Sequence, residues 1–550
     1  MFMLQNSRTK KTFILGATLF AFLSSNATYW NWKKIEISVD TLSFKNEKNK
    51  NDFLFGVASS SHQVEGPDGA QDKIYNNWLK CEKKEFEIEG KKTVPLSQAV
   101  GDACRHWKKY KEDIQLMKNL GFNTYKFSIS WGKIQPKEKG KLNEQALQHY
   151  EDVCKELVKH GIKPIVTLYH YVHPCWFEDK GAFEKEENIK YFVEFTKEVY
   201  KRLKKYVNIW FPIGSFIGVY ASHGRGMKPP FKHDMQFATE VLKNMLESHV
   251  KVYHELKKID EKPTIGICKS ILHIDPYSSW NPLDQLASSQ SKKLTRSSIY
   301  NFFSKGVFKI WIPTQAKIKY ENKQAIGAFD CIGLNYYAGV YISNFKLVPR
   351  SDLISTQDDL YAIYPEGLHR GLKEIWDNLA KQFNVPIYVT ENGIATDKSQ
   401  DRDLFFKRHL YAVSKAIADG IDVRGYLVWT LTDCYEWEFG YDRQYGLYSV
   451  DRKTQERKLK DGTQFLIDVV KKNNQNPAFA RLREGYDGQA KAQFILSEGE
   501  GAGATPYVPS VRPQGKAKAK DGTQFLVDVV KKNGQSSKSE ETKEKIVEKI

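Results

Sequence analysis

The chain has 550 residues, of which 41% are hydrophobic, 27% charged and 13% aromatic, and its formal net charge is +18. This composition is ordinary for a globular protein with a large core. Lys and Arg are spread along the chain without basic–aromatic interleaving or zinc-finger spacing, so nucleic acid is not an expected partner. The seven cysteines are widely spaced and form no C-x-x-C pair, which argues against a disulfide framework or a zinc site.

The N-terminus has the pattern of an export signal. Arg8, Lys10 and Lys11 precede the apolar run 12–23, and small residues follow at a spacing suited to cleavage. The run is too short for an ordinary membrane span, although an uncleaved anchor remains an alternative. We therefore predict a signal peptide at 1–27, a linker at 28–51 and export to the periplasm, cell envelope or medium.

Short apolar runs alternate with amphipathic segments from residue 52 to residue 475. The segments 110–121, 144–161 and 404–420 have apolar residues at helical spacing, and the first two end at a Gly suited to a left-handed cap. Eight strands separated by helices predict an α/β fold, a single (β/α)₈ TIM barrel with long loops. A doubly wound open sheet is the alternative, but no G-x-G-x-x-G follows the first strand. The eight expected strands are 53–60, 124–131, 163–170, 209–213, 264–268, 331–337, 386–393 and 425–431.

An internal repeat follows the predicted barrel. The stretch "KDGTQFLIDVVKKNNQ" (460–475) recurs as "KDGTQFLVDVVKKNGQ" (520–535), and the intervening residues are rich in Gly, Ala and Pro. The first copy is expected to form the last barrel helix. Residues 476–550 are predicted to be a flexible tail with no assigned task.

Glu391 is the first candidate catalytic residue. It follows the predicted strand in "PIYVTENG" (386–393), and the carboxyl ends of barrel strands face the active site. An exposed carboxylate in a turn would show the same short pattern, so the surrounding motifs decide between the two interpretations.

Several motifs together resemble glycoside hydrolase family one, the β-glucosidase family, across about residues 52–473. The matching stretches occur in the family's order and spacing. They are "FLFGVASSSHQVEG", "GDACRHWKKYKEDIQLMKNLGFNTYKFSISW", "IYPEGL", "PIYVTENGIA" and "VWTLTDCYEWEFGYDRQYGLYSVD". The resemblance implies a retaining mechanism with two carboxyl groups about 5–5.5 Å apart, one nucleophilic and one serving as acid and then base.

The resemblance also assigns roles to individual residues. Glu391 matches the nucleophile, and Tyr337 matches the phenol that hydrogen-bonds to it. Trp429 matches the stacking floor of the sugar site, Tyr445 stands at an aromatic wall, and Glu436 suits neutral hydroxyls rather than a sugar phosphate. The residues that match the holders of the sugar hydroxyls are Gln63, His106, Trp107, Glu436 and Trp437.

The general acid of the family is missing from its expected place. Gly214, Ser215 and Phe216 stand where the family has Asn-Glu-Pro, and no acidic residue lies between Glu198 and Asp234. A serine hydroxyl cannot donate a proton usefully near neutral pH, and glycine has no side chain to bind the 2-hydroxyl of the sugar. Other loops offer candidate acids at Glu178 and Asp179, and Lys126 replaces the family's Arg in the second strand, so charge is kept but the planar fork of donors is lost.

Three functions remain open. The chain could be an altered enzyme restricted to activated β-glycosides, or a non-catalytic carbohydrate-binding or envelope protein. It could also be an ordinary β-glucosidase with an acid from another loop. The expected ligand is a β-linked sugar or glycoside. No cofactor or metal is expected, because this chemistry needs only carboxylates, and no specific protein partner is predicted.

Overall fold

The computed structural model describes residues 30–474 apart from 46–52, 68–74, 83–85, 89–90, 94–97, 313, 345, 349–352 and 358–361. The predicted signal peptide and the predicted tail with the second repeat copy lie outside the described residues. Part of the predicted linker is described, and it packs on the barrel. Trp30 N and Trp32 Nε1 each donate to Glu366 Oε1 at 2.9 Å, and Phe44 is buried in the core.

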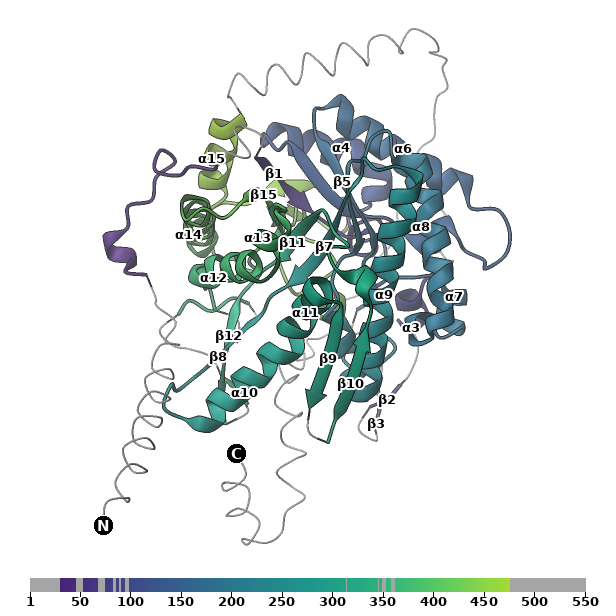
Figure 1. Cartoon of the computed structure of the whole chain (residues 1–550). Helices are drawn as coiled ribbons and strands as arrows, with labels where there is room; N and C mark the ends of the chain where they lie inside the picture. Colours follow the sequence, from purple (N-terminus) through teal and green to yellow (C-terminus); the bar gives the residue numbers. More distant parts are fainter. Residues whose placement is uncertain are drawn as a thin grey trace, which may run out of the picture.

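Eight parallel strands close into a barrel in the order β1-β15-β14-β11-β7-β6-β5-β4 (Figure 1). This confirms the predicted TIM barrel and excludes the open sheet. The strands are β1 (Leu54–Ala58), β4 (Thr124–Ser128), β5 (Lys163–Tyr169), β6 (Ile209–Ile213), β7 (Thr264–Ser270), β11 (Cys331–Asn335), β14 (Ile387–Asn392) and β15 (Val423–Trp429).

Helices surround the barrel. The predicted segments 110–121, 144–161 and 404–420 form α4 (His106–Asn119), α6 (Glu144–Lys159) and α14 (Ser399–Ala418). Gly121 and Gly161 follow α4 and α6 with φ of 86° and 72°, so both expected left-handed caps are present. The other longer helices are α8 (Ile189–Leu203), α9 (Met235–Ile259), α10 (Pro282–Lys292), α11 (Ser298–Lys305), α12 (Pro365–Ile375) and α15 (Gln464–Asn474).

Short elements decorate the loops. The short helices are α2 (Ser61–Val64), α3 (Asn77–Cys81), α5 (Trp131–Ile134), α7 (Cys175–Asp179) and α13 (Lys381–Phe383). The small sheets are β2 (Phe86–Ile88) with β3 (Lys91–Thr93), β9 (Val307–Ile312) with β10 (Ala316–Glu321), β16 (Tyr448–Val450) with β17 (Arg457–Leu459), and β8 (His273–Pro276) with β12 (Gly339–Ser343) and β13 (Lys346–Val348). No described helix is both long and apolar enough to cross a bilayer.

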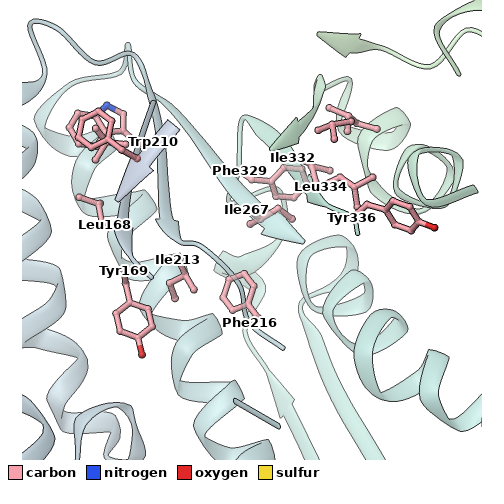
Figure 2. Packing of buried hydrophobic residues seen from close by; sticks show 14 of the residues in the cluster. Leu168, Tyr169, Trp210, Ile213, Phe216, Ile267, Phe329, Ile332, Leu334 and Tyr336 are labelled. Carbon is pink, nitrogen blue, oxygen red and sulfur yellow. The ribbon is translucent and has the colours of Figure 1, made fainter. Parts of the chain in front are cut away.

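The core has two layers because each strand turns alternate side chains inward and outward. The outer layer lies between strands and helices. Figure 2 shows Trp210 of β6, Ile267 of β7 and Ile332 of β11 in this layer. The inner layer fills the barrel and includes Phe211 and Tyr388. Near the carboxyl ends of the strands it gives way to polar side chains, and these form the site.

An irregularity in β14 positions the key carboxylate. Leu334 of β11 pairs with Val389, but the next residue, Asn335, pairs with Glu391, so Thr390 is an extra residue on β14. Such a bulge bends a strand and changes the direction of the side chains that follow. Thr390 Oγ1 donates to Asn335 Oδ1 at 2.7 Å and fixes the bulge.

Candidate active site

A cavity of about 310 Å³ opens at the carboxyl ends of the barrel strands. Side chains that follow β5, β6, β7, β11, β14 and β15 line it, as expected of a TIM-barrel active site. Glu391 reaches it from β14 and is 4% exposed. The predicted nucleophile therefore lies at the base of a substrate-sized cavity.

Both oxygens of Glu391 have a donor. Lys126 Nζ donates to Oε1 at 2.6 Å, and the Tyr337 hydroxyl donates to Oε2 at 2.8 Å. Lys126 comes from β4, which β1 and β15 separate from β14, and Tyr337 follows β11. Lys126 contacts only one carboxylate oxygen, so the second depends on the phenol.

The charges around Glu391 are those of an ion pair beside a neutral phenol. Burial opposes the charged form of Lys126, but the Glu391 carboxylate more than compensates, and the pKa of the lysine is raised. Burial and the same carboxylate raise the pKa of Tyr337 well above its usual value. Lys126 therefore stays charged and Tyr337 stays protonated, and both donate to a carboxylate that must be ionised to attack.

The predicted sugar-binding side chains largely meet in this cavity. Trp429, Glu436, Trp437 and Tyr445 line it together with Glu391. The Trp429 indole donates to Glu436 Oε2 at 3.4 Å. Gln63 contacts the same carboxylate, since its Nε2 donates to Glu436 Oε2 at 3.0 Å. Flat aromatic faces beside a carboxylate can stack on a sugar ring and accept its hydroxyl protons.

Two of the residues predicted to bind the sugar lie outside this cavity. His106 Nδ1 bonds Asp113 Oδ2 at 2.8 Å, and its ring lines a separate void of about 10 Å³. Trp107 stacks on His149 with ring centroids 3.7 Å apart. Neither lines the cavity of Glu391, which corrects their expected role. Both are on the helix α4, which packs outside the barrel.

His170 is the residue that the sequence prediction missed. It follows the last residue of β5 and lines the cavity, with its ring centroid 6.0 Å from Trp429 and 5.9 Å from Trp437. Burial lowers its pKa to about 4, so the ring is neutral and can hydrogen-bond to a hydroxyl. Its place at the end of a predicted strand was the available signal, because strand ends face the site.

Ser215, the predicted replacement of the acid, also lies in the wall of this cavity. It follows β6, lines the cavity and is 3% exposed. Its hydroxyl lies 2.9 Å from Ser270 Oγ and interacts with the hydroxyl of Tyr171. Burial raises the pKa of Tyr171, so this phenol is a weaker proton donor than an ordinary tyrosine.

The absent side chain at Gly214 leaves polar neighbours without partners. A Cβ at Gly214 would lie 3.2 Å from His170 Nδ1 and from Thr167 Cγ2. His170 Nδ1 and Thr167 Oγ1 are buried and have no hydrogen-bond partner among the described residues. A polar side chain at position 214 would face both groups.

The two alternative acids do not line the Glu391 cavity. Glu178 lines a neighbouring void of about 40 Å³ and bonds His173 Nε2 at 2.6 Å. Burial opposes its ionisation, but the bond and charge of His173 prevail and lower its pKa. Asp179 forms an ion pair with Lys80. Among the described lining residues, the carboxylates besides Glu391 are Glu436 and Glu438, and Glu438 lies 3.2 Å from Lys228 Nζ.

Comparisons with known proteins agree with this geometry. A family model described as "Glycosyl hydrolase family 1" matches residues 45–475. Beta-glucosidase A of Acetivibrio thermocellus is 29% identical over 461 residues, covering 77% of this chain and 98% of its own. A 6-phospho-beta-galactosidase of Clostridium acetobutylicum is 30% identical, covering 74% of this chain and 94% of its own.

Solved structures show the same likeness. The beta-glucosidase from Thermotoga maritima in complex with glucoimidazole aligns with a TM-score of 0.68 and 28% identity, over 77% of this chain and 98% of that one. A beta-glycosidase from Pyrococcus horikoshii aligns with a TM-score of 0.65 and 32% identity, over 78% and 96% of the two chains.

Proposed function

Because the chain belongs to glycosyl hydrolase family 1, we propose that it is a β-glycosidase-like protein that reacts only with activated β-glycosides. Glu391 is its nucleophile, and position 215 supplies no proton. The observation that carries this proposal is the pair of opposite walls: a fully supported Glu391 on β14, and Ser215 after β6 in the same cavity.

The first chemical step needs no acid when the leaving group is good. Glu391 attacks the anomeric carbon, the bond to the leaving atom breaks, and the electron pair departs with the leaving group. Phenolates of low basicity, carboxylates and thiolates leave in this way. An alkoxide of a second sugar needs a proton, and losing the positioned acid costs about 10²–10⁴-fold, or about 3–5 kcal/mol of barrier.

The second step is also impaired, because water must attack the glycosyl-enzyme without a general base. A nucleophile that carries no proton to remove, such as azide, avoids this difficulty. The covalent intermediate should therefore accumulate with activated substrates in water, and azide should release it as the glycosyl azide.

The cup is proposed to hold a neutral sugar. Trp429 would form its floor, Glu436 and Gln63 would bind hydroxyls, and Trp437 and Tyr445 would form the walls. His170 adds a neutral donor or acceptor that His106 and Trp107 do not provide. A carboxylate at Glu436 repels a phosphate, so we expect no 6-phosphoglycoside to bind, although one relative is named for that substrate.

A covalent labelling experiment tests the function. The purified protein is incubated with a 2-deoxy-2-fluoro-β-glucoside of 2,4-dinitrophenol and analysed by peptide mass spectrometry. We expect one adduct, on Glu391, and none in Glu391→Gln. An unlabelled wild type that still binds glucosides would instead favour the carbohydrate-binding function. Cleavage of cellobiose at ordinary β-glucosidase rates would contradict the role given to Ser215.

We further propose export, on the strength of the pattern at residues 1–27. The test is the N-terminal sequence and cell fraction of the protein in its native cell. Cleavage near residue 27 would support the proposal, and an intact N-terminus in the cytosolic fraction would contradict it.

A further inference from the structure

The helix α15 is held in place by contacts that begin before the helix itself. Lys460 Nζ bonds Asp433 Oδ1 at 2.6 Å, and Arg402 donates to the carbonyl of Asp461 at 2.8 Å. Gly462 follows with φ of 81°, and a Cβ there would lie 2.2 Å from the backbone oxygen of Ser399. The docking unit therefore starts at Lys460 with an anchor and a turn that only glycine fits.

The helix then presents an apolar face to the barrel. Leu466, Val469 and Val470 are fully buried in the outer core layer, with Phe465 and Ile467 at 9% and 4% exposure. At its end the Asn474 amide donates to the carbonyl of Gly121, and Asn474 Oδ1 accepts from Asn123 Nδ2 at 3.1 Å. We call the surface that these contacts define the α15 seat.

Residues 520–535 repeat this docking unit from its first anchor to the end of the helix. The repeat starts at Lys520, which corresponds to Lys460, and not at an arbitrary point of the helix. β17 and its Arg457, which bonds Asp113 at 2.9 Å, precede the unit and are not repeated. In the sequence, Lys520, Asp521, Gly522 and Thr523 correspond to the anchor and turn of the first copy, and Phe525, Leu526, Val529 and Val530 correspond to its buried residues Phe465, Leu466, Val469 and Val470.

We propose that residues 520–535 are a second occupant of the α15 seat, which replaces residues 460–475 of the same chain when these leave. Complementarity carries the inference, because side chains that fit the seat in one copy are present in the same order in the other. The chain between β17 and Lys520 is long enough for the second copy to reach the α15 seat of its own molecule. Residues 460–519 would then form one surface loop. Loop-closure entropy rises only slowly with loop length.

Two sequence differences rank the occupants. Val527 replaces the buried Ile467 and lacks one carbon, which weakens core packing by about twofold to tenfold. Gly534 replaces Asn474, so the contacts to Gly121 and Asn123 are absent, at a further cost of about twofold to tenfold for each hydrogen bond. The first copy therefore fills the seat in the unmodified chain, and the second acts when the first is damaged.

A double-mutant cycle in the full-length chain tests this exchange. Leu466→Asp places an unpaired charge in the seat, and Leu526→Asp makes the matched change in the second copy. We expect Leu526→Asp alone to leave the melting temperature unchanged and Leu466→Asp alone to lower it slightly. The melting temperature of the double variant should fall by at least about twice the sum of the two single decreases, because no intact copy remains to fill the seat.

Equal melting temperatures of Leu466→Asp and the double variant would overturn the proposal. If the aspartate variants yield no folded protein, Leu466→Ala and Leu526→Ala make the same comparison with a smaller loss of stability. The cycle uses stability alone, so its outcome does not depend on whether the barrel is catalytic.

Crosslinking identifies the occupant directly. Lys472 Nζ bonds Asp40 Oδ1 at 2.7 Å, and Lys532 takes the place of Lys472 in the second copy. In the Leu466→Asp background, Asp40→Cys with Lys532→Cys should form an intramolecular crosslink with a short bismaleimide, located by peptide mass. Asp40→Cys with Lys472→Cys in the unmodified chain is the positive control. No 40–532 crosslink, or one that joins two molecules, would contradict exchange within one chain.

Discussion

At the scale of single residues, the cavity holds a carboxylate with a donor on each oxygen and, on another part of its wall, a serine. Glu391 keeps a donor on each oxygen, from Lys126 and from Tyr337. Ser215 bonds to another serine and cannot supply a proton near neutral pH. A side chain that restores an acid at this one position should therefore restore reactivity with poor leaving groups.

Ser215→Glu should raise kcat/KM on cellobiose by up to about 10²-fold, because positioned acid catalysis is worth about 10²–10⁴-fold. On 2,4-dinitrophenyl β-glucoside kcat/KM, which reports the first step, should change little because that leaving group needs no proton, whereas kcat should rise because the new carboxylate also serves as the base of the second step. Steady-state kinetics on both substrates measure the difference. Ser215→Gln, of the same size without an acid, is the control and should gain nothing.

Adding Gly214→Asn to Ser215→Glu should raise the cellobiose rate further. The new amide would face His170 Nδ1 and Thr167 Oγ1, which lack partners, and could bind the 2-hydroxyl. The neighbours must yield by a few tenths of an ångström, because the new Cβ lies 3.2 Å from them. A double variant no faster than Ser215→Glu would mean that another part of the sugar site limits the rate.

The pH dependence of the activated reaction should lack its usual basic limb. That limb reports loss of the acid's proton, and position 215 has none to lose. Lys126 and Tyr337 have pKa values raised above their usual 10.5 and 10.0, so both keep their protons to at least about pH 10. We expect kcat/KM on 2,4-dinitrophenyl β-glucoside to stay level from neutral pH to about 10. A basic limb near neutrality would reveal an unrecognised acid.

At the scale of elements, backbone irregularities position the chemistry and end the helices. The extra residue in β14 directs Glu391 into the cavity, and left-handed glycines end α4 and α6. At Gly161 a Cβ would have no neighbour within 4 Å, so the left-handed backbone is the reason for glycine there.

Gly161→Ala should destabilise the protein by about 1–2 kcal/mol, which is the cost of left-handed backbone for a residue with a Cβ. Gly161→Asn should cost less, because asparagine adopts this conformation more readily. Denaturant unfolding of both variants measures the difference. Equal losses for Ala and Asn would show that backbone strain is not the cause.

At the scale of the whole molecule, burial keeps several histidines neutral. Desolvation lowers the pKa of His62 and His409 to about 3 and that of His170 and His249 to about 4, from the usual 6.5. In the unfolded chain these histidines bind protons as the pH falls below 6.5, whereas in the folded chain they are not protonated until the pH falls to about 4. Stability should therefore rise with pH across this window and fall on acidification.

Calorimetric unfolding should show this linkage as proton uptake. Burial likewise lowers the pKa of His149 to about 3 and that of His273 well below its usual value. At pH 5.5 we therefore expect about five protons taken up per molecule on unfolding, measured from the dependence of the enthalpy on buffer ionisation. Each histidine contributes up to about 1.4 kcal/mol per pH unit to the slope of stability. His409→Leu should reduce the uptake by about one proton, and an unchanged uptake would contradict the assignment.

Local patterns in the sequence were enough to predict the barrel. Short apolar runs mark buried strands and helical spacing marks amphipathic helices, and the expected strands correspond to the eight that close the barrel. Strand-end position predicted Glu391 at the mouth of the barrel, because in this topology every strand ends there, and the family resemblance added Tyr337 and Trp429.

Only the tertiary structure decided which polar residues share the cavity. His106 and Trp107 match the motif but lie on a helix outside the barrel, whereas His170 enters from the end of β5. The tertiary structure also shows that Glu178 lies outside the cavity of Glu391, since His173 bonds the Glu178 carboxylate in a neighbouring void. The physical reason is that spacing along a chain determines which face a side chain takes on its own element. Which elements meet is determined by long-range packing, which brings β4, β11 and β14 together at one carboxylate.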